Sequence, residues 1–260
     1  ISADLTPILN GYLFPYTIGL AAIYAAVFLL RRNRDAISVR EQALSPALLV
    51  LGNVVLTLSV PVQVDGAWIA VTWAIEATAM IWLSMRLGLV ELRWFGLGVF
   101  VAIVVRLLLF DTGTHRSTDL LIINYRVLAF TAGVAALYVA AFFTRRYQDT
   151  TEPWEIRYAL PGMLVLASFL SIWILSAELI SAVDGRTVDI TFRDAEFVKS
   201  LGLSLLWALY ASVSLFVGII GQWRKVRLGA LVLLTVPILK LFTIDAVSLE
   251  QGYRVAAFLS

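Results

Sequence analysis

The 260-residue sequence contains no cysteine and only one histidine, His115. Without thiols the chain forms no disulfide, no thiolate metal site and no cysteine nucleophile, and a single histidine argues against a histidine-based metal site. Charged residues are scarce, at 15%, and the formal net charge is only +2. No basic stripe with interleaved aromatic residues is present, so nucleic acid is not expected as a partner. We therefore expect no metal and no cofactor.

The sequence also lacks the short motifs that mark several enzyme classes. It contains no Gly-x-x-x-x-Gly-Lys-Ser/Thr, no His-Glu-x-x-His and no Gly-x-Ser-x-Gly. The stretches between its apolar segments are too short for a soluble catalytic domain, so we favour a non-enzymatic role. No initiator methionine or signal peptide opens the sequence, and an apolar segment begins just before its end. We expect it to be a segment of a longer protein.

Apolar residues are abundant, at 60% of the sequence, and the mean hydropathy is +0.88. A soluble domain of this size has no core large enough to bury so many, so the expected surroundings are a lipid bilayer. A transmembrane helix needs about 20 mostly apolar residues. The sequence therefore predicts an all-α, polytopic integral membrane bundle with eight complete transmembrane helices and a truncated ninth. The expected spans lie near 8–30, 43–64, 67–85, 94–111, 120–143, 158–182, 198–221 and 227–245, with the ninth opening near 252.

Basic residues gather in every second connection between these spans. The opposite connections carry acids such as Asp65, Asp119 and Asp184. By the positive-inside rule the basic connections are cytoplasmic, which places the N-terminus of the segment outside. The basic residues concerned are Arg31, Arg32, Arg34, Arg40, Arg86, Arg93, Arg145, Arg146, Arg157, Arg224, Lys225 and Arg227.

The two halves of the chain resemble each other. One alignment of the chain with itself, without a gap, lays Trp73 on Trp207, Arg93 on Arg227, Arg106 on Lys240 and Asp111 on Asp245. Because a unit of four spans is even, successive copies enter the membrane the same way, as parallel repeats. We predict a first four-span repeat at 1–119, a second at 120–251, and the start of a third at 252–260.

The pattern Trp73-Ala74-x-Glu76-Ala77, then Arg106-x4-Asp111, then Tyr125-Arg126-Val127-Leu128-Ala129-Phe130 resembles a family of bacterial predicted membrane proteins. That family is the one catalogued as domain of unknown function 2339, and this chain is similar to its C-terminal portion. The resemblance implies repeated membrane helices and a location in the bacterial inner membrane. It implies no particular activity.

Charged residues inside spans cost about 2.5–3.5 kcal/mol each on insertion and usually face the interior of a bundle. Glu76 is the only acid expected at mid-span depth, and neighbouring helices could bring it to Arg106. Two interpretations remain open for such charges: a site for an ion, proton or anionic head group, or an ion pair that only aids packing. The candidate polar cluster comprises Glu76, Arg106, Asp111, Tyr125, Arg126, Lys240, Asp245 and Arg254.

Arg126 is expected to pair with Asp111 and pin the spans together, although its guanidinium could also bind a phosphate or carboxylate. Trp73, Trp207 and Tyr210 are the aromatic candidates, and packing is favoured over a stacking platform for the two tryptophans. Tyr210 takes the place of Glu76 in the second copy. A site built on Glu76 would therefore exist only once.

We favour transport, or the handling of a lipid or envelope precursor, through an outward-facing polar site. The expected partners are the lipid bilayer and an anionic small molecule or lipid head group. Two alternatives remain open: a membrane-embedded enzyme acting on a lipid-linked substrate, and a structural or assembly component of the envelope.

Overall fold

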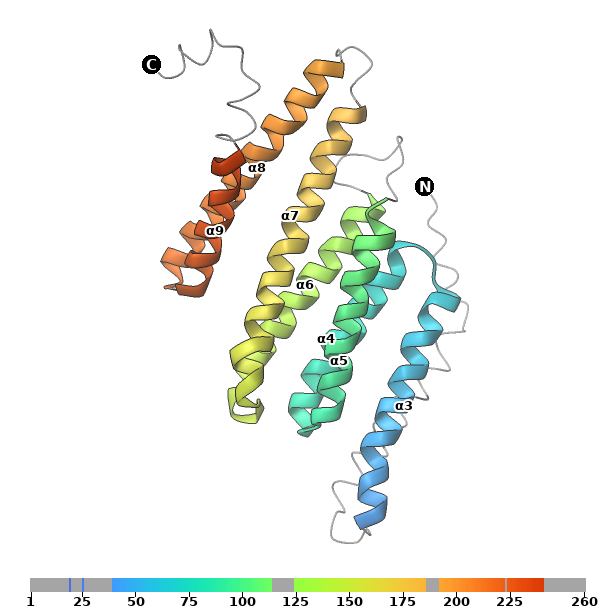
Figure 1. Cartoon of the computed structure of the whole chain (residues 1–260). Coiled ribbons are helices and arrows are strands. Elements are labelled where there is room, and N and C mark those ends of the chain that lie inside the picture. The colour runs from blue at the N-terminus through green and yellow to red at the C-terminus, as the bar shows by residue number, and fades with distance from the viewer. Residues whose placement is uncertain are drawn as a thin grey trace. The chain divides into compact units, whose positions relative to one another are not determined.

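The computed structural model describes residues 39–113, 124–185, 192–222 and 224–240, together with Gly19 and Ala25 (Figure 1). Within these residues the chain is helical throughout and contains no strand, which confirms the all-α expectation. The first and ninth expected spans lie almost entirely outside the described residues. The described residues form seven α-helices: α3 (Val39–Gln63), α4 (Ala67–Leu87), α5 (Val90–Arg106), α6 (Tyr125–Arg146), α7 (Leu160–Gly185), α8 (Phe192–Ile220) and α9 (Arg224–Lys240).

Among the described residues, five helical segments are long and apolar enough to cross a membrane. Each coincides with one of the expected spans. They are Ala67–Leu87, Val90–Asp111, Tyr125–Arg146, Glu155–Asp184 and Val198–Ile220. Many of their large apolar side chains are exposed, as at Phe110, Val165 and Leu205. In a bilayer these side chains face lipid.

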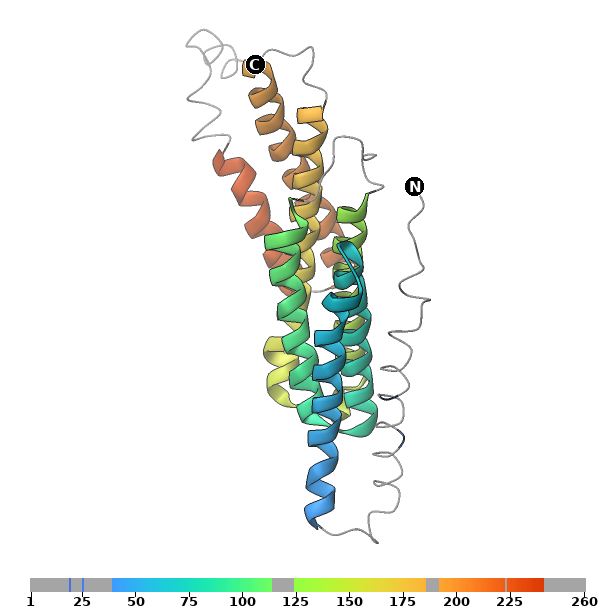
Figure 2. The same cartoon turned by 90° about the vertical axis from the view of Figure 1, so that its right-hand side faces the viewer.

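The described chain divides into two compact units, residues 1–171 and 172–260. In the first unit α4 packs against both α5 and α6, and α3 packs against α4 and α5 (Figure 2). Fully buried apolar side chains such as Ile81, Ile103, Phe130 and Leu137 fill the space between these helices. The first unit thus holds most of the buried core.

Helix boundaries in the first unit follow local backbone chemistry. Gly66 and Gly88 adopt φ values of 58° and 64°, which glycine reaches without steric cost, and they flank α4 on either side. Asn124 is the N-cap of α6, because its side chain accepts a hydrogen bond from the Val127 amide at 2.8 Å. These signals fix where α4 begins and ends and where α6 starts.

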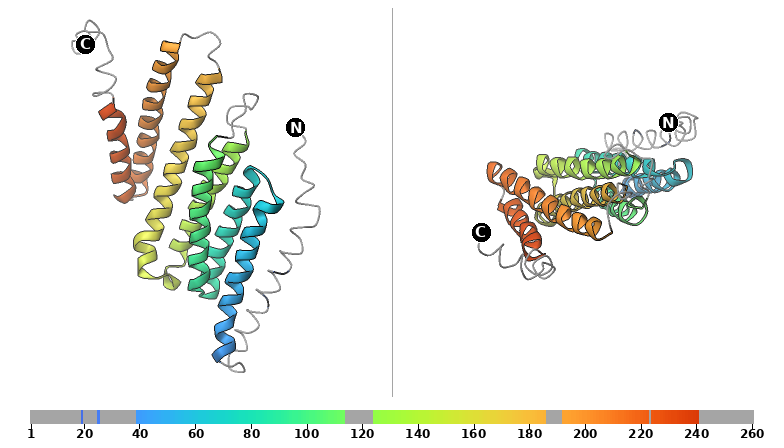
Figure 3. Two further views of the ribbon diagram at one scale, coloured as in Figure 1. Left: turned by 45° about the vertical axis from the view of Figure 1, so that its right-hand side comes forward. Right: turned by 90° about the horizontal axis from the view of Figure 1, so that it is seen from above.

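The second unit contains the remainder of α7 together with α8 and α9. Helix α9 packs side by side with part of the longer α8 (Figure 3). The Trp207 indole of α8 donates to Ser176 Oγ of α7 at 2.9 Å, and Lys199 pairs with Asp184 at 2.6 Å. Polar contacts therefore supplement apolar packing among these three helices.

Candidate functional site

Glu76 lies in the middle of α4, about 15 Å along the helix from Gly66. The residue is 8% exposed. One carboxyl oxygen, Oε1, lies 2.7 Å from Thr57 Oγ1 of α3, and the other, Oε2, is buried without a hydrogen-bond partner. A buried carboxyl oxygen that lacks a partner is costly, and such groups in native structures call for an explanation.

Trp73 lies one turn before Glu76 on the same helix. Its indole nitrogen donates to the Thr57 carbonyl oxygen at 3.0 Å, so both side chains contact the same residue of α3. The indole is partly buried and packs against the apolar cluster of Val60, Val64 and Ile69. Trp73 therefore fixes α3 against α4 beside the carboxyl group, as expected of a packing residue.

Arg106 and Asp111 meet at one end of α5. Five residues of a regular α-helix turn through about 500°, which would leave the two side chains about 140° apart. Residues Leu107–Asp111 instead form a π-helical turn, which adds one residue per turn and brings residues i and i+5 together. Arg106 Nε consequently lies 3.4 Å from Asp111 Oδ2, while Nη2 donates to the Gly66 carbonyl oxygen at 2.9 Å.

The start of α6 adds a second arginine to this end. Arg126 is 4% exposed and donates through Nη1 to the carbonyl oxygen of Thr112, the residue after Asp111, at 3.1 Å. Tyr125 beside it is 47% exposed. Gly66, Arg106, Asp111 and Arg126 thus form one polar group, which we call the α5–α6 polar end.

The structure does not bring Glu76 and Arg106 together. Arg106 is engaged with Gly66 and Asp111, whereas Glu76 contacts Thr57. The reason is register: Arg106 lies beside the residue that precedes α4, and Glu76 lies almost three turns further along that helix. The two charges, which neighbouring helices could have brought together, therefore do not meet in the described structure.

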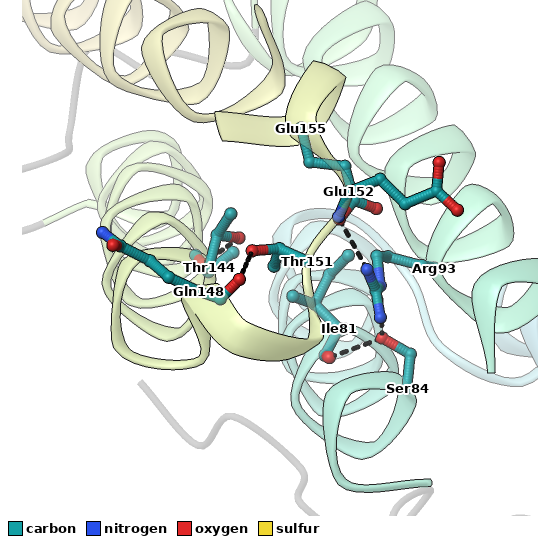
Figure 4. Close-up of polar contacts among 9 residues, drawn as sticks. Ile81, Ser84, Arg93, Thr144, Gln148, Thr151, Glu152 and Glu155 are labelled. Carbon is teal, nitrogen blue, oxygen red and sulfur yellow. Dashed lines mark hydrogen bonds and ion pairs between the residues drawn. The ribbon is translucent and has the colours of Figure 1, made fainter. Parts of the chain in front are cut away.

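The opposite end of the first unit holds a buried ion pair that was not expected from the sequence (Figure 4). Arg93 and Glu155 are each 2% exposed, and Arg93 Nη1 lies 2.5 Å from Glu155 Oε2. Arg93 Nε also approaches Ser84 Oγ of α4 at 3.4 Å, and the Glu152 amide donates to Glu155 Oε2 at 2.9 Å. The pair therefore ties α4 and α5 to the segment before α7.

A small pocket adjoins this ion pair. Glu155 belongs to a second π-helical turn, Glu155–Ala159, and its Oε1 is buried without a hydrogen-bond partner. Beside it, the rings of Trp94 and Trp154 stack with centroids 4.4 Å apart. The pocket is lined by Ile81, Arg93, Leu97, Thr144, Glu155, Ala159 and Met163.

Arg93 was expected in a cytoplasmic connection. The structure places it in the first turns of α5, where its side chain turns inward. A hydropathy pattern shows how close a charged residue lies to a span end, but it does not show whether the side chain points into the bundle. Since Glu155 lies 62 residues later, nothing in the sequence near Arg93 indicates that the two residues pair. The alignment of Arg93 with Arg227 was a weak hint that the position is special.

In the second unit the structure places three of the remaining candidates. Lys240 Nζ donates to the Ser200 carbonyl oxygen at 2.7 Å and to the hydroxyl oxygens of Ser200 and Ser204 at 2.8 and 3.0 Å. Trp207 contacts Ser176, and Tyr210 is half-buried. Asp245 and Arg254 lie outside the described residues. Within the described part of the chain, no group of three or more acids or histidines is arranged to hold a metal ion.

Comparison with known proteins gives a family. Residues 12–118 and 96–260 match the family described as "Predicted membrane protein (DUF2339)". No curated protein and no solved structure matches the chain. Because the two matched regions together cover nearly the whole sequence, the chain belongs to this family of predicted membrane proteins of unknown function.

Proposed function

We propose that this membrane protein transports a small polar species, or handles the head group of an anionic lipid, through polar residues inside its first unit. The observation that carries the proposal is the Glu76 carboxyl group at mid-span depth, with one oxygen buried and lacking a hydrogen-bond partner. Ionisable residues at such depth are costly and mark ion or substrate pathways in many membrane proteins.

The α5–α6 polar end supports the same proposal. It places two guanidinium groups near the end of a span, where an anionic head group would lie. By the distribution of basic residues this end faces outside. Glu76 and the polar end are about 15 Å apart along α4, so the polar end would receive the substrate and Glu76 would exchange an ion deeper in the bundle.

Vesicle assays test the proposal. We would reconstitute the chain into phosphatidylglycerol-containing vesicles and follow two probes: a fluorescent short-chain phosphatidylglycerol for lipid movement, and an internal pH-sensitive dye for ion movement. We expect at least one probe to move faster than in protein-free vesicles, and Glu76→Gln to remove that acceleration. Asp149→Asn, an exposed change just after α6, is the matched control and should leave the rate unchanged.

If neither probe moves faster than in protein-free vesicles, or if Glu76→Gln retains the full rate, the proposal is wrong. A structural role in the envelope would then be favoured. Two features support that alternative. Arg93 and Arg106 both have protein partners, and Gly96 packs closely against Ile81 and Met80. Those features are typical of a firmly packed bundle.

A further inference from the structure

The contacts of Thr57 determine where the hydrogens around Glu76 must be. Thr57 Oγ1 lies 2.8 Å from the Asn53 carbonyl oxygen and 2.7 Å from Glu76 Oε1. Both distances are those of true hydrogen bonds. A threonine hydroxyl, however, carries one hydrogen and can donate it only once. One of the two contacts therefore needs a hydrogen from elsewhere.

The Asn53 carbonyl oxygen has none to give, since a backbone carbonyl is only an acceptor. Glu76 is the remaining source. If Oε1 carries a proton, its hydroxyl donates to Thr57 Oγ1, and the Thr57 hydroxyl donates in turn to the Asn53 carbonyl oxygen. Both contacts are then satisfied, and Oε2 remains as the acceptor oxygen of a neutral acid. An ionised carboxylate in the same place would leave two short oxygen–oxygen contacts with a single hydrogen to share between them.

In the described part of the chain, no opposite charge is placed to favour the ionised form. Glu76 makes no ion pair among these residues. The charged residues of α4 and of the helices packed against it lie near helix ends, away from its middle. They are Arg40 and Glu41 on α3, Arg86 on α4, Glu91, Arg93 and Arg106 on α5, and Arg126, Arg145 and Arg146 on α6.

From this geometry we propose that Glu76 is a proton carrier: it rests as a neutral carboxylic acid bonded to Thr57, and the proton is the species that it exchanges. This inference rests on the proposed transport function and names the exchanged ion. On release, the O–H bond at Oε1 breaks, the proton passes to a water molecule and the electron pair stays on the carboxylate. The Thr57 hydroxyl then rotates from Asn53 to Glu76 Oε1, so the carboxylate gains a donor.

Infrared spectroscopy of the full chain in lipid vesicles tests this directly. A protonated carboxyl group has a carbonyl stretching band that an ionised carboxylate lacks. We expect such a band at neutral pH, its complete loss in Glu76→Gln, and its persistence in the control Asp149→Asn, an exposed change. Raising the pH should remove the band, because the acid then ionises.

Thr57 supplies a second test that does not depend on how well Glu76→Gln folds. In Thr57→Val the carboxyl hydroxyl loses its acceptor, so the band should shift to higher frequency, whereas Thr57→Ser should leave it unshifted. A band that is absent at neutral pH, or unmoved by Thr57→Val, would overturn the proposal. The measurement needs no substrate, so it can succeed or fail independently of the vesicle assays.

Discussion

Two arginines on one helix show how differently the same side chain can be placed. Arg106 is part-exposed, donates to the Gly66 carbonyl oxygen and forms an ion pair with Asp111, whereas Arg93 is fully buried against Glu155. Burial makes stability more sensitive to substitutions in the Arg93–Glu155 pair than to substitutions in the Arg106–Asp111 pair. Loss of one partner of the fully buried pair leaves an uncompensated charge with no access to its surroundings, whereas the part-exposed side chain of Arg106 keeps some access.

At this scale we predict that Arg93→Met or Glu155→Met alone lowers the free energy of unfolding by about 3–5 kcal/mol. The double substitution should cost less than the sum of the two, because no isolated charge remains buried. A thermal or denaturant-unfolding cycle in detergent measures this. The part-exposed pair Lys199 and Asp184 is the comparison, and its cycle should give about 0–1 kcal/mol. Additive effects at Arg93 and Glu155 would contradict the pair.

At the level of elements, two π-helical turns in the described residues accompany the ion pairs Arg106–Asp111 and Arg93–Glu155. Leu107–Asp111 follows Arg106, and Glu155–Ala159 begins with Glu155 itself. Turns of this kind are rare, and they often occur at functional sites. Here the first turn aligns two side chains five residues apart. The five-residue spacing of Arg106 and Asp111 in the sequence therefore corresponds to a contact between them. A regular α-helix would not produce that contact, so the spacing alone did not predict it.

The close packing of α4 on α5 depends on one glycine. A Cβ atom at Gly96 would lie 3.2 Å from Ile81 Cδ1 and 3.3 Å from Met80 Cβ, whereas one at Gly98 would meet nothing within 4 Å. We predict that Gly96→Ile destabilises the bundle by about 1–3 kcal/mol through overpacking. Gly98→Ile, two residues away on the same helix, is the control with equal helix propensity. Equal melting temperatures for the two variants would show that α4 and α5 do not pack as described.

Equivalent polar contacts occur at corresponding positions of the two proposed repeats. Arg106 donates to the carbonyl oxygen of Gly66, and Lys240 donates to that of Ser200. The ungapped alignment that lays Arg106 on Lys240 also lays Gly66 on Ser200, and it lays α5 on α9 from end to end. We propose that α4–α5 and α8–α9 are copies, and these parallel contacts support that proposal. The repeat boundaries at 119 and 251 remain predictions.

For the molecule as a whole, two exposed positions report orientation in the membrane. Gly113 and Asp149 lie at opposite ends of the first unit, one after α5 and the other after α6. We predict that Gly113 faces outside and Asp149 the cytoplasm, because the basic residues gather on the side of Asp149. The 260-residue sequence has no cysteine, so Gly113→Cys and Asp149→Cys each give it one thiol. An impermeant thiol reagent on intact cells should label only Gly113→Cys, and the reverse pattern would invert the topology.

The sequence alone determined the membrane environment, the helical fold and the approximate spans of the described helices. Those properties follow from local composition, because about 20 consecutive apolar residues in lipid have no alternative to hydrogen bonding within their own helix. It also identified Glu76, Arg106, Asp111 and Arg126 as unusual, since charges in apolar helices are visible without a structure.

Which of these residues meet depends on how the helices pack in three dimensions. Which side chains pair depends on the register of neighbouring helices and on the direction in which each side chain points. Helix arrangements that differ in these respects can bury the same apolar residues, so hydropathy does not distinguish them. The packing of the helices keeps Glu76 away from Arg106, and a π-helical turn brings Arg106 to Asp111. The same packing brings Arg93 to Glu155, which lies 62 residues later. It also sets Thr57 between Asn53 and Glu76, the contact on which the proposed protonation of Glu76 rests and that no spacing in the sequence predicts.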